Sequence, residues 1–188
     1  RGPATDVEGT RRLLEVALAA GVGHLLFISI VGMEGVPYPY YGFKLAAEAI
    51  VMEGSVPWTI LRATQCHSLI EFFLATFARV PAVLPVPYRW QFQPVDPSEV
   101  GDRLAELAVA PAAGLLPDFG GPEVREMRSL AESWRKARGI NKPMFNLTPP
   151  LKFSRQWAAG ALLCPDHRDG KITFEQYLET SKRPAARS

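Results

Sequence analysis

The segment that decides the fold runs from residue 24 to residue 62 and reads HLLFISIVGMEGVPYPYYGFKLAAEAIVMEGSVPWTILR. Its first six residues, 24–29, form a short apolar run bounded by glycines, which is typical of a strand buried on both faces. Residues 41–53 repeat apolar side chains at helical spacing, and residues 58–62 repeat the buried-strand pattern. A helix that links two such strands by short connections predicts parallel strands and a doubly wound α/β fold.

The flanking sequence extends the same alternation. Residues 6–20 have one broad apolar stripe and a stop signal at Gly21, which predicts a helix that precedes the first strand. Residues 80–97 carry five of the 17 prolines and are therefore not expected to form a long regular element. The remaining expected elements are helices over residues 66–78, 97–110, 125–138, 153–163 and 173–181, and brief strands over 93–95 and 115–119.

The composition is that of an ordinary globular domain. The 188 residues are 47% hydrophobic and 21% charged, with a net charge of +2, which gives no support for a nucleic-acid partner. No apolar run approaches the ~18 residues of a membrane span, so no membrane partner is expected. Cys66 and Cys164 lack metal-ligand spacing and are interpreted as reduced thiols of a cytoplasmic protein; no metal site is predicted.

Ser29, Tyr40 and Lys44 are the residues best suited to chemistry. A tyrosine four residues before a lysine at a helix start places both side chains on one face. The ammonium should favour the ionised phenol and lower the tyrosine pKa from about 10, which would make Tyr40 a general acid or base. Ser29 ends the preceding strand, where ligands bind in open α/β sheets, and is expected to hold a substrate oxygen.

The spacing alone also fits a structural interpretation, and by itself it favours that interpretation. Tyr38, Tyr40 and Tyr41 crowd one loop and could simply pack together, while Lys44 would be a solvated helix residue. His67, which follows the second strand closely, is expected to be a packed histidine, although it could line a pocket.

Two aromatic residues of the proline-rich segment present the same choice. Trp90 and Phe92 could cap a substrate pocket, but aromatic side chains in such a segment more often cover the core. Core cover is therefore the preferred interpretation for both.

The ordered set of motifs resembles the second part of an atypical short-chain dehydrogenase/reductase, and most of all the NmrA-like NAD(P)-binding members. The resemblance spans nearly the whole chain and is carried by DVEGTRRLL (6–14), GVGHLLFISIVG (21–32), YYGFKLAAE (40–48), VPWTILRATQ (56–65), FQPVDPSEV (92–100), GGPE (120–123) and GKITFEQYL (170–178).

The resemblance implies roles for individual residues. Ser29, Tyr40 and Lys44 match the catalytic positions of the family, and Lys44 would also bind the cofactor ribose. Arg62, Ala63, Thr64 and Gln65 match the loop beside the nicotinamide, although Ala63 stands where relatives usually have proline.

A resemblance of this kind implies a Rossmann-type parallel sheet. We expect a single domain over residues 1–188, in which 1–65 form the C-terminal half of the Rossmann core. Residues 66–188 would form a small, mostly helical substrate-side region.

The family's first βαβ units and glycine-rich phosphate turn have no counterpart in this sequence. The only Gly-x-Gly, at Gly21 and Gly23, precedes a strand and is in the wrong context. We therefore expect an incomplete sheet and poor dinucleotide binding by this chain alone.

The resulting functional hypothesis is an NAD(P)-dependent oxidoreductase that acts on a small carbonyl, alcohol or enone, with NADP preferred to NAD on family habit. A non-catalytic redox sensor of the NmrA type and an inactive fragment are the alternatives, and nucleotide-sugar epimerase or dehydratase chemistry is a weaker one. A small-molecule substrate is the expected partner, and a homodimer stays open.

Overall fold

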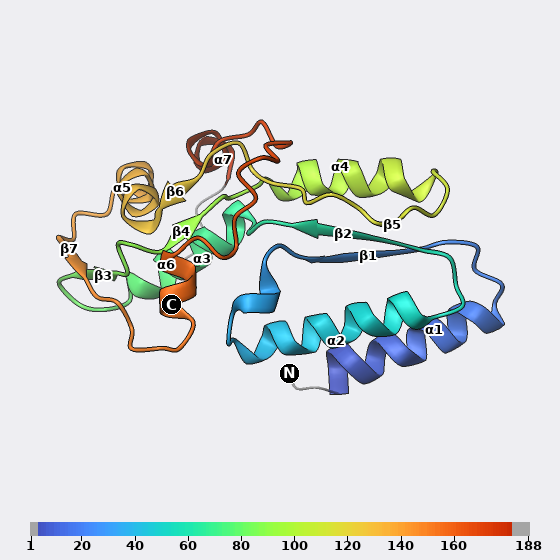
Figure 1. Cartoon of the computed structure of the whole chain (residues 1–188). Coiled ribbons are helices and arrows are strands. Elements are labelled where there is room, and N and C mark those ends of the chain that lie inside the picture. Colours follow the sequence, from blue (N-terminus) through green and yellow to red (C-terminus); the bar gives the residue numbers. More distant parts are fainter. Residues whose placement is uncertain (1–3, 182–188) are drawn as a thin grey trace.

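The computed structural model describes residues 4–181 and contains the predicted parallel sheet. Strands β1 (Leu25–Ile30), β2 (Trp58–Ala63) and β5 (Gly114–Leu115) lie in the order β1-β2-β5, and all are parallel (Figure 1). The β1–β2 pairing is continuous from Leu25 opposite Trp58 to Ile30 opposite Ala63. The two strands predicted from the deciding segment are therefore confirmed, each extended or shifted by about one residue.

Helices cover both faces of the sheet, as a doubly wound fold requires. Helix α1 (Gly9–Ala19), preceded by a π-helical turn over Ala4–Glu8, and helix α2 (Pro39–Glu53) lie on one face, whereas α4 (Pro97–Ala108) lies on the other (Figure 1). The core between α1, α2 and the sheet is formed by the buried side chains of Leu14, Ala17, Val51, Val56 and Ile60.

Strand β1 departs from the expectation of burial on both faces. The Ile28 side chain is 44% exposed, and β1 pairs only with β2 among the described residues, so it is an edge strand. β2 lies between β1 and β5, and its central residues Thr59, Ile60 and Leu61 are buried. The apolar run at residues 24–29 correctly indicated a strand, but a run of residues carries no information about neighbours on either side.

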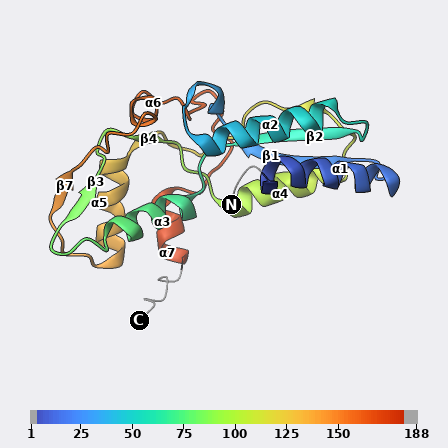
Figure 2. The ribbon, with the colours of Figure 1, turned by 90° about the horizontal axis from the view of Figure 1, so that it is seen from below.

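A second region stands at the carboxyl ends of β1 and β2 (Figures 1 and 2). Its helices are α3 (His67–Phe77), α5 (Met127–Arg138), α6 (Ser154–Ala158) and α7 (Phe174–Thr180). It also has a parallel pair, β3 (Leu84–Val86) with β7 (Met144–Asn146), and an antiparallel pair, β4 (Gln91–Phe92) with β6 (Arg125–Glu126). Segment 97–119 returns from this region to the sheet as α4 and β5.

Three expected elements differ in the structure. The helix expected over 153–163 is confined to Ser154–Ala158, and Gly160 follows in the left-handed region at φ 79°, which ends it. The expected strand at 93–95 contributes only one bridge, between Val95 and Cys66, and β4 precedes it. Strand β5 is similarly short, and Phe119 adds only a bridge to Ala63.

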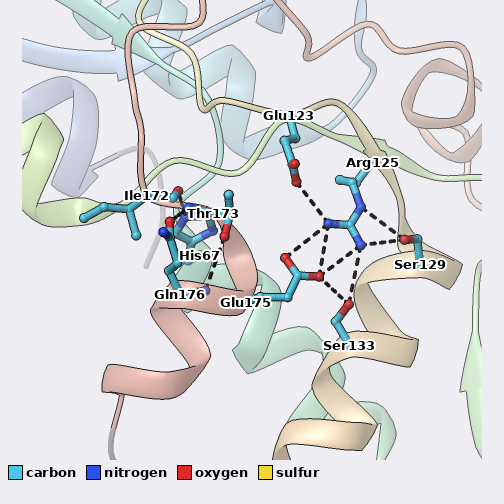
Figure 3. A network of polar contacts seen from close by, with 9 residues as sticks. All are labelled: His67, Glu123, Arg125, Ser129, Ser133, Ile172, Thr173, Glu175 and Gln176. Carbon is cyan, nitrogen blue, oxygen red and sulfur yellow. Dashed lines mark hydrogen bonds and ion pairs between the residues drawn. The ribbon is translucent and has the colours of Figure 1, made fainter.

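Helix α7 is fixed to the rest of the fold by a polar network (Figure 3). Thr173 and Gln176 form a reciprocal capping box at its first turn. The Arg125 guanidinium donates to both carboxylate oxygens of Glu175 at 3.2–3.3 Å, and Ser133 donates to the same carboxylate at 2.5 Å. These contacts lower the pKa of Glu175 although burial opposes the shift. The network joins α7 to β6 and α5.

No helix within residues 4–181 has both the length and the apolar character needed to cross a membrane.

Candidate active site

A cavity of about 630 Å³ opens at the carboxyl ends of β1 and β2, between α2 and α3. This is the place where ligands bind in open α/β sheets, and the volume is within the range of small-molecule sites. Six of the seven residues singled out from the sequence line it, namely Ser29, Tyr40, Lys44, Ala63, Thr64 and Gln65. Arg62 does not belong to the lining.

Ser29 is the fifth residue of β1 and lines this cavity. Its side chain is 3% exposed, and its hydroxyl oxygen has no hydrogen-bond partner among the described residues. A buried hydroxyl without a partner is unfavourable, because it has lost its water contacts without replacement. Ser29 is therefore available to donate a hydrogen bond to a ligand.

Tyr40 lies in the first turn of α2, directly after Pro39, which is well suited to the first position of a helix. The expectation that Lys44 lowers its pKa is wrong. Partial burial raises the pKa of Tyr40, and the nearby charge of Asp6 and the phenol of Tyr38 act in the same direction. Tyr40 is therefore a neutral phenol at physiological pH, suited to donate a proton rather than to accept one.

Lys44 does not lower the pKa of Tyr40, because its ammonium group is directed at the edge of the sheet. Its Nζ donates to the backbone oxygen of Ile28 at 2.9 Å and lies 4.2 Å from the centre of the Phe27 ring. Burial lowers the pKa of Lys44, although the carboxylates of Asp6 and Glu48 act in the opposite direction. An ammonium group has three N–H donors, so two remain for a ligand.

The polar side chains between Arg62 and Gln65 differ in their contacts, and Arg62 is bound to carboxylates. The Arg62 guanidinium makes two bonds to the buried carboxylate of Glu48, at 3.0 and 2.6 Å, and one to Glu34 at 2.6 Å. These carboxylates raise the pKa of Arg62 and hold the side chain away from the cavity. Arg62 thus ties β2 to α2 in this structure.

The Thr64 side chain has hydrogen-bond partners, whereas the Gln65 side chain has none among the described residues. The Thr64 hydroxyl donates to the Gln93 backbone oxygen at 2.5 Å and accepts from the Gly121 backbone N–H at 3.2 Å. Gln65 is 6% exposed, and neither its amide nitrogen nor its amide oxygen has a partner among the described residues. Only Gln65 in this stretch keeps an uncommitted polar side chain.

The apolar wall of the cavity was not foreseen from the sequence. Leu69, Phe72 and Phe73 project from one face of α3, at spacings of three and four residues, and line the cavity. The opposite face, which includes Ile70 and Leu74, is buried in the core. A helix that is apolar on all sides signals burial on both faces or a ligand wall, and this signal was present in residues 66–78.

The other candidates have structural roles. His67 is buried outside the cavity lining, with its Nε2 2.9 Å from the Ile172 oxygen and its ring stacked on Tyr177. Burial lowers the pKa of His67. Trp90 and Phe92 both belong to the core, as preferred, and Phe92 also reaches the cavity. No group of three or more candidate metal ligands was found among the residues that the structure describes.

The described residues fit the nicotinamide end of a dinucleotide. The unpartnered Ser29 hydroxyl and the two remaining Lys44 N–H groups supply donors at the strand ends, beside an open cavity. A pyrophosphate cradle is not formed by Gly21 and Gly23, which lie in the turn between α1 and β1 and not at a helix N-terminus.

Comparison with known proteins places the chain by its structure alone. No protein-family model and no curated protein matches the sequence. A new type of NADPH-dependent quinone oxidoreductase from Escherichia coli has a TM-score of 0.72 at 14% identity, over 90% of this chain and 71% of that chain.

Two nucleotide-sugar enzymes are also similar. A nucleoside-diphosphate-sugar epimerase from Staphylococcus aureus has a TM-score of 0.72 at 13% identity, over 95% of this chain and 72% of that chain. An NAD-dependent NDP-hexosamine 5,6-dehydratase of tunicamycin biosynthesis has a TM-score of 0.69 at 15% identity, over 95% and 71%. This chain therefore spans about 70% of the length of these three proteins.

TM-scores of 0.69–0.72 at identities of 13–15% show the fold alone. The chain has the Rossmann-type α/β fold of NAD(P)-binding oxidoreductases and epimerases, which confirms the predicted fold class. These neighbours are a reductase, an epimerase and a dehydratase, which is consistent with the family that the sequence resembles.

Proposed function

We propose that the cavity is the active site of an NAD(P)-dependent oxidoreductase that reduces a small, mostly apolar carbonyl compound or enone. The observation that carries the proposal is the gathering of Ser29, Tyr40 and Lys44 around one cavity at the carboxyl ends of parallel strands. The apolar wall of α3 supports a substrate with a ring or chain of low polarity. It gives less support to the sugar ring of an epimerase substrate, which would require more polar partners.

Each of the three residues has a role that follows from its surroundings. The Ser29 hydroxyl donates a hydrogen bond to the carbonyl oxygen and polarises it. The Tyr40 phenol, kept protonated by its raised pKa, delivers a proton to that oxygen as negative charge develops. The two remaining N–H groups of Lys44 bind the ribose hydroxyls of the cofactor. Reduced nicotinamide, when bound, supplies the hydride that the carbonyl carbon accepts.

This assignment favours reduction over oxidation. A phenol with a raised pKa donates its proton readily only when a basic oxygen forms beside it, and it is a poor acceptor in the neutral range. The Tyr40 phenol should therefore not limit reduction up to about pH 9, because it remains protonated there. The choice between NADP and NAD stays with the family resemblance, which favours NADP.

The test is turnover of a panel of ketones, enones and quinones, with NADPH or NADH and with reduced nicotinamide mononucleotide, which requires no pyrophosphate cradle. Tyr40→Phe should lower kcat/KM at least ~100-fold, because it removes a general acid. Tyr41→Phe is the matched control: Tyr41 is buried beside Tyr40 and also lines the cavity, so the variant tests whether the loss of any phenol hydroxyl there lowers turnover. It should retain most of the activity.

Two outcomes would contradict the proposal. Turnover unchanged by Tyr40→Phe would remove this residue from the chemistry. Nicotinamide binding without any turnover across the panel would favour the redox-sensor alternative.

A further inference from the structure

Gln65 is a buried amide that the protein leaves without partners beside the cavity. The neighbouring polar side chains have defined contacts: Arg62 binds two carboxylates, and Thr64 joins two backbone segments. The Gln65 amide has neither kind of contact among residues 4–181, although its backbone oxygen accepts from Val95 N–H at 3.0 Å. The backbone is thus held in place while the side-chain amide is uncommitted.

An arrangement of this kind is unfavourable in the free protein. Both the donor and the acceptor of a primary amide lose hydration on burial, and an apolar side chain of similar size would avoid the loss. The amide torsion of glutamine is broad, so the group turns with little strain toward a partner in the adjoining cavity. A ligand that offers an acceptor and a donor side by side would satisfy both atoms at once.

The geometry of the sheet places this amide beyond the proposed reaction centre. Ser29 lies opposite Arg62 in the β1–β2 register, so Gln65 is three residues further along the chain. At a strand rise of about 3.3 Å per residue, its Cα lies at most about 10 Å past Ser29 in that direction. A ring with two polar groups on one edge can therefore reach both residues.

The apolar part of the cavity lining suits a flat apolar body. Phe72 and Phe73 of α3 line the cavity together with Trp157 of α6. Aromatic side chains bind flat rings by offset or edge-to-face contacts, in addition to apolar burial. The site thus combines an apolar slot with a paired donor and acceptor.

We propose that Gln65 determines the substrate class, by pairing its amide with a cyclic amide or an equivalent donor–acceptor edge of a flat ring ketone. The inference rests on the proposed function, because that function places the reacting carbonyl at Ser29 and Tyr40. Gln65 touches a part of the substrate that does not react. It therefore acts on binding and selectivity.

The probes are isatin (1H-indole-2,3-dione), a flat ketone with an adjoining cyclic amide, and N-methylisatin, in which a methyl group replaces the amide hydrogen and removes the donor. Dissociation constants are measured by calorimetry with the full 188-residue chain. Wild type should bind isatin about tenfold more tightly, as expected for the loss of one hydrogen bond that leaves a buried acceptor unpaired. Gln65→Met should bind both probes equally.

The Tm of Gln65→Met distinguishes a ligand-binding role of Gln65 from a structural role. Gln65→Met should raise the Tm, because it removes two unpartnered polar atoms, whereas a structural glutamine would lower the Tm on replacement. Gln156→Met is the matched control, since Gln156 also has a buried, unpartnered amide oxygen but does not line the cavity. It should leave the preference for isatin intact.

The outcomes separate this inference from the proposed function. Equal binding of both probes by wild type, no binding of either, or an unchanged preference in Gln65→Met would overturn the role of Gln65. NADPH-dependent reduction of both probes at equal efficiency would support the proposed oxidoreductase activity and contradict the role of Gln65. A preference for isatin without any turnover, with reduced nicotinamide mononucleotide as well as with NADPH, would instead count against the oxidoreductase alone.

Discussion

The ion pair between Glu71 and Arg138 should be a main contributor to stability, and the substitution Glu71→Gln tests this. The two side chains are each 8% exposed, with Arg138 Nε 2.7 Å from Glu71 Oε1. The same carboxylate accepts from Trp134 Nε1 at 3.2 Å and from the Tyr177 hydroxyl at 3.0 Å. One buried group thus joins α3, α5 and α7.

The magnitude follows from what glutamine keeps and loses. Its amide oxygen can still face Arg138 and Trp134, and its NH₂ group can donate to the Tyr177 hydroxyl. The negative charge is lost, and a buried cation then faces a neutral group, which typically costs about 3–5 kcal/mol. Since the hydrogen bonds are largely kept, we expect about 3 kcal/mol, or a Tm lower by roughly 6–12 °C for a chain of this size.

The assay is thermal and urea unfolding followed by circular dichroism, with Glu132→Gln as the control. Glu132 pairs with Arg128 on α5 at 3.1 Å, but both side chains are more than half exposed. That change should cost at most about 0.5 kcal/mol. If the two variants unfold within about 1 °C of each other, the reasoning on the buried pair is refuted.

Three further variants test the acid response and the backbone. Burial lowers the pKa of His67 below its usual 6.5. Neutral His67 therefore stabilises the fold above pH 6.5, and this stability is lost as the pH falls through the lowered pKa of the folded state. His67→Gln should flatten the acid limb of a stability–pH curve, and an unchanged limb would contradict this. Gly101→Ala, in open space on α4, should stabilise the fold by up to about 1 kcal/mol, measured by the urea midpoint. Gly32→Ala should instead unfold the protein, because Gly32 has φ 70° and a Cβ there would overlap the Ala161 oxygen; loss of the native circular dichroism spectrum in buffer without urea checks this.

The parts of the fold that could be predicted are those set by local sequence. The strand at residues 24–29, the helix at 41–53 and the strand at 58–62 each contain their own periodicity, and all three form within one or two residues of the expected bounds. The short pairs β3–β7 and β4–β6 were missed. Each depends on contacts between segments more than 30 residues apart, which no local pattern records.

The candidate site was predictable in position and not in electrostatics. Ser29, Tyr40 and Lys44 meet at one cavity because strand ends and a helix start converge there. The effect of Lys44 on Tyr40 could not be read from spacing. It depends on a free backbone oxygen at Ile28 that holds the ammonium, and on Asp6, which approaches from a different helical segment.

The contrast among the polar residues at the end of β2 and just after it shows how this site is built. Sequence position alone makes Arg62, Thr64 and Gln65 equal candidates for ligand contacts, yet their partners come from distant segments: Arg62 is held by Glu48, and Thr64 by the backbone of Gln93. Those bonds fix the loop. Because the loop is fixed, the uncommitted Gln65 amide is held near the cavity without partners of its own, and its missing hydrogen bonds mark where a ligand has most to contribute.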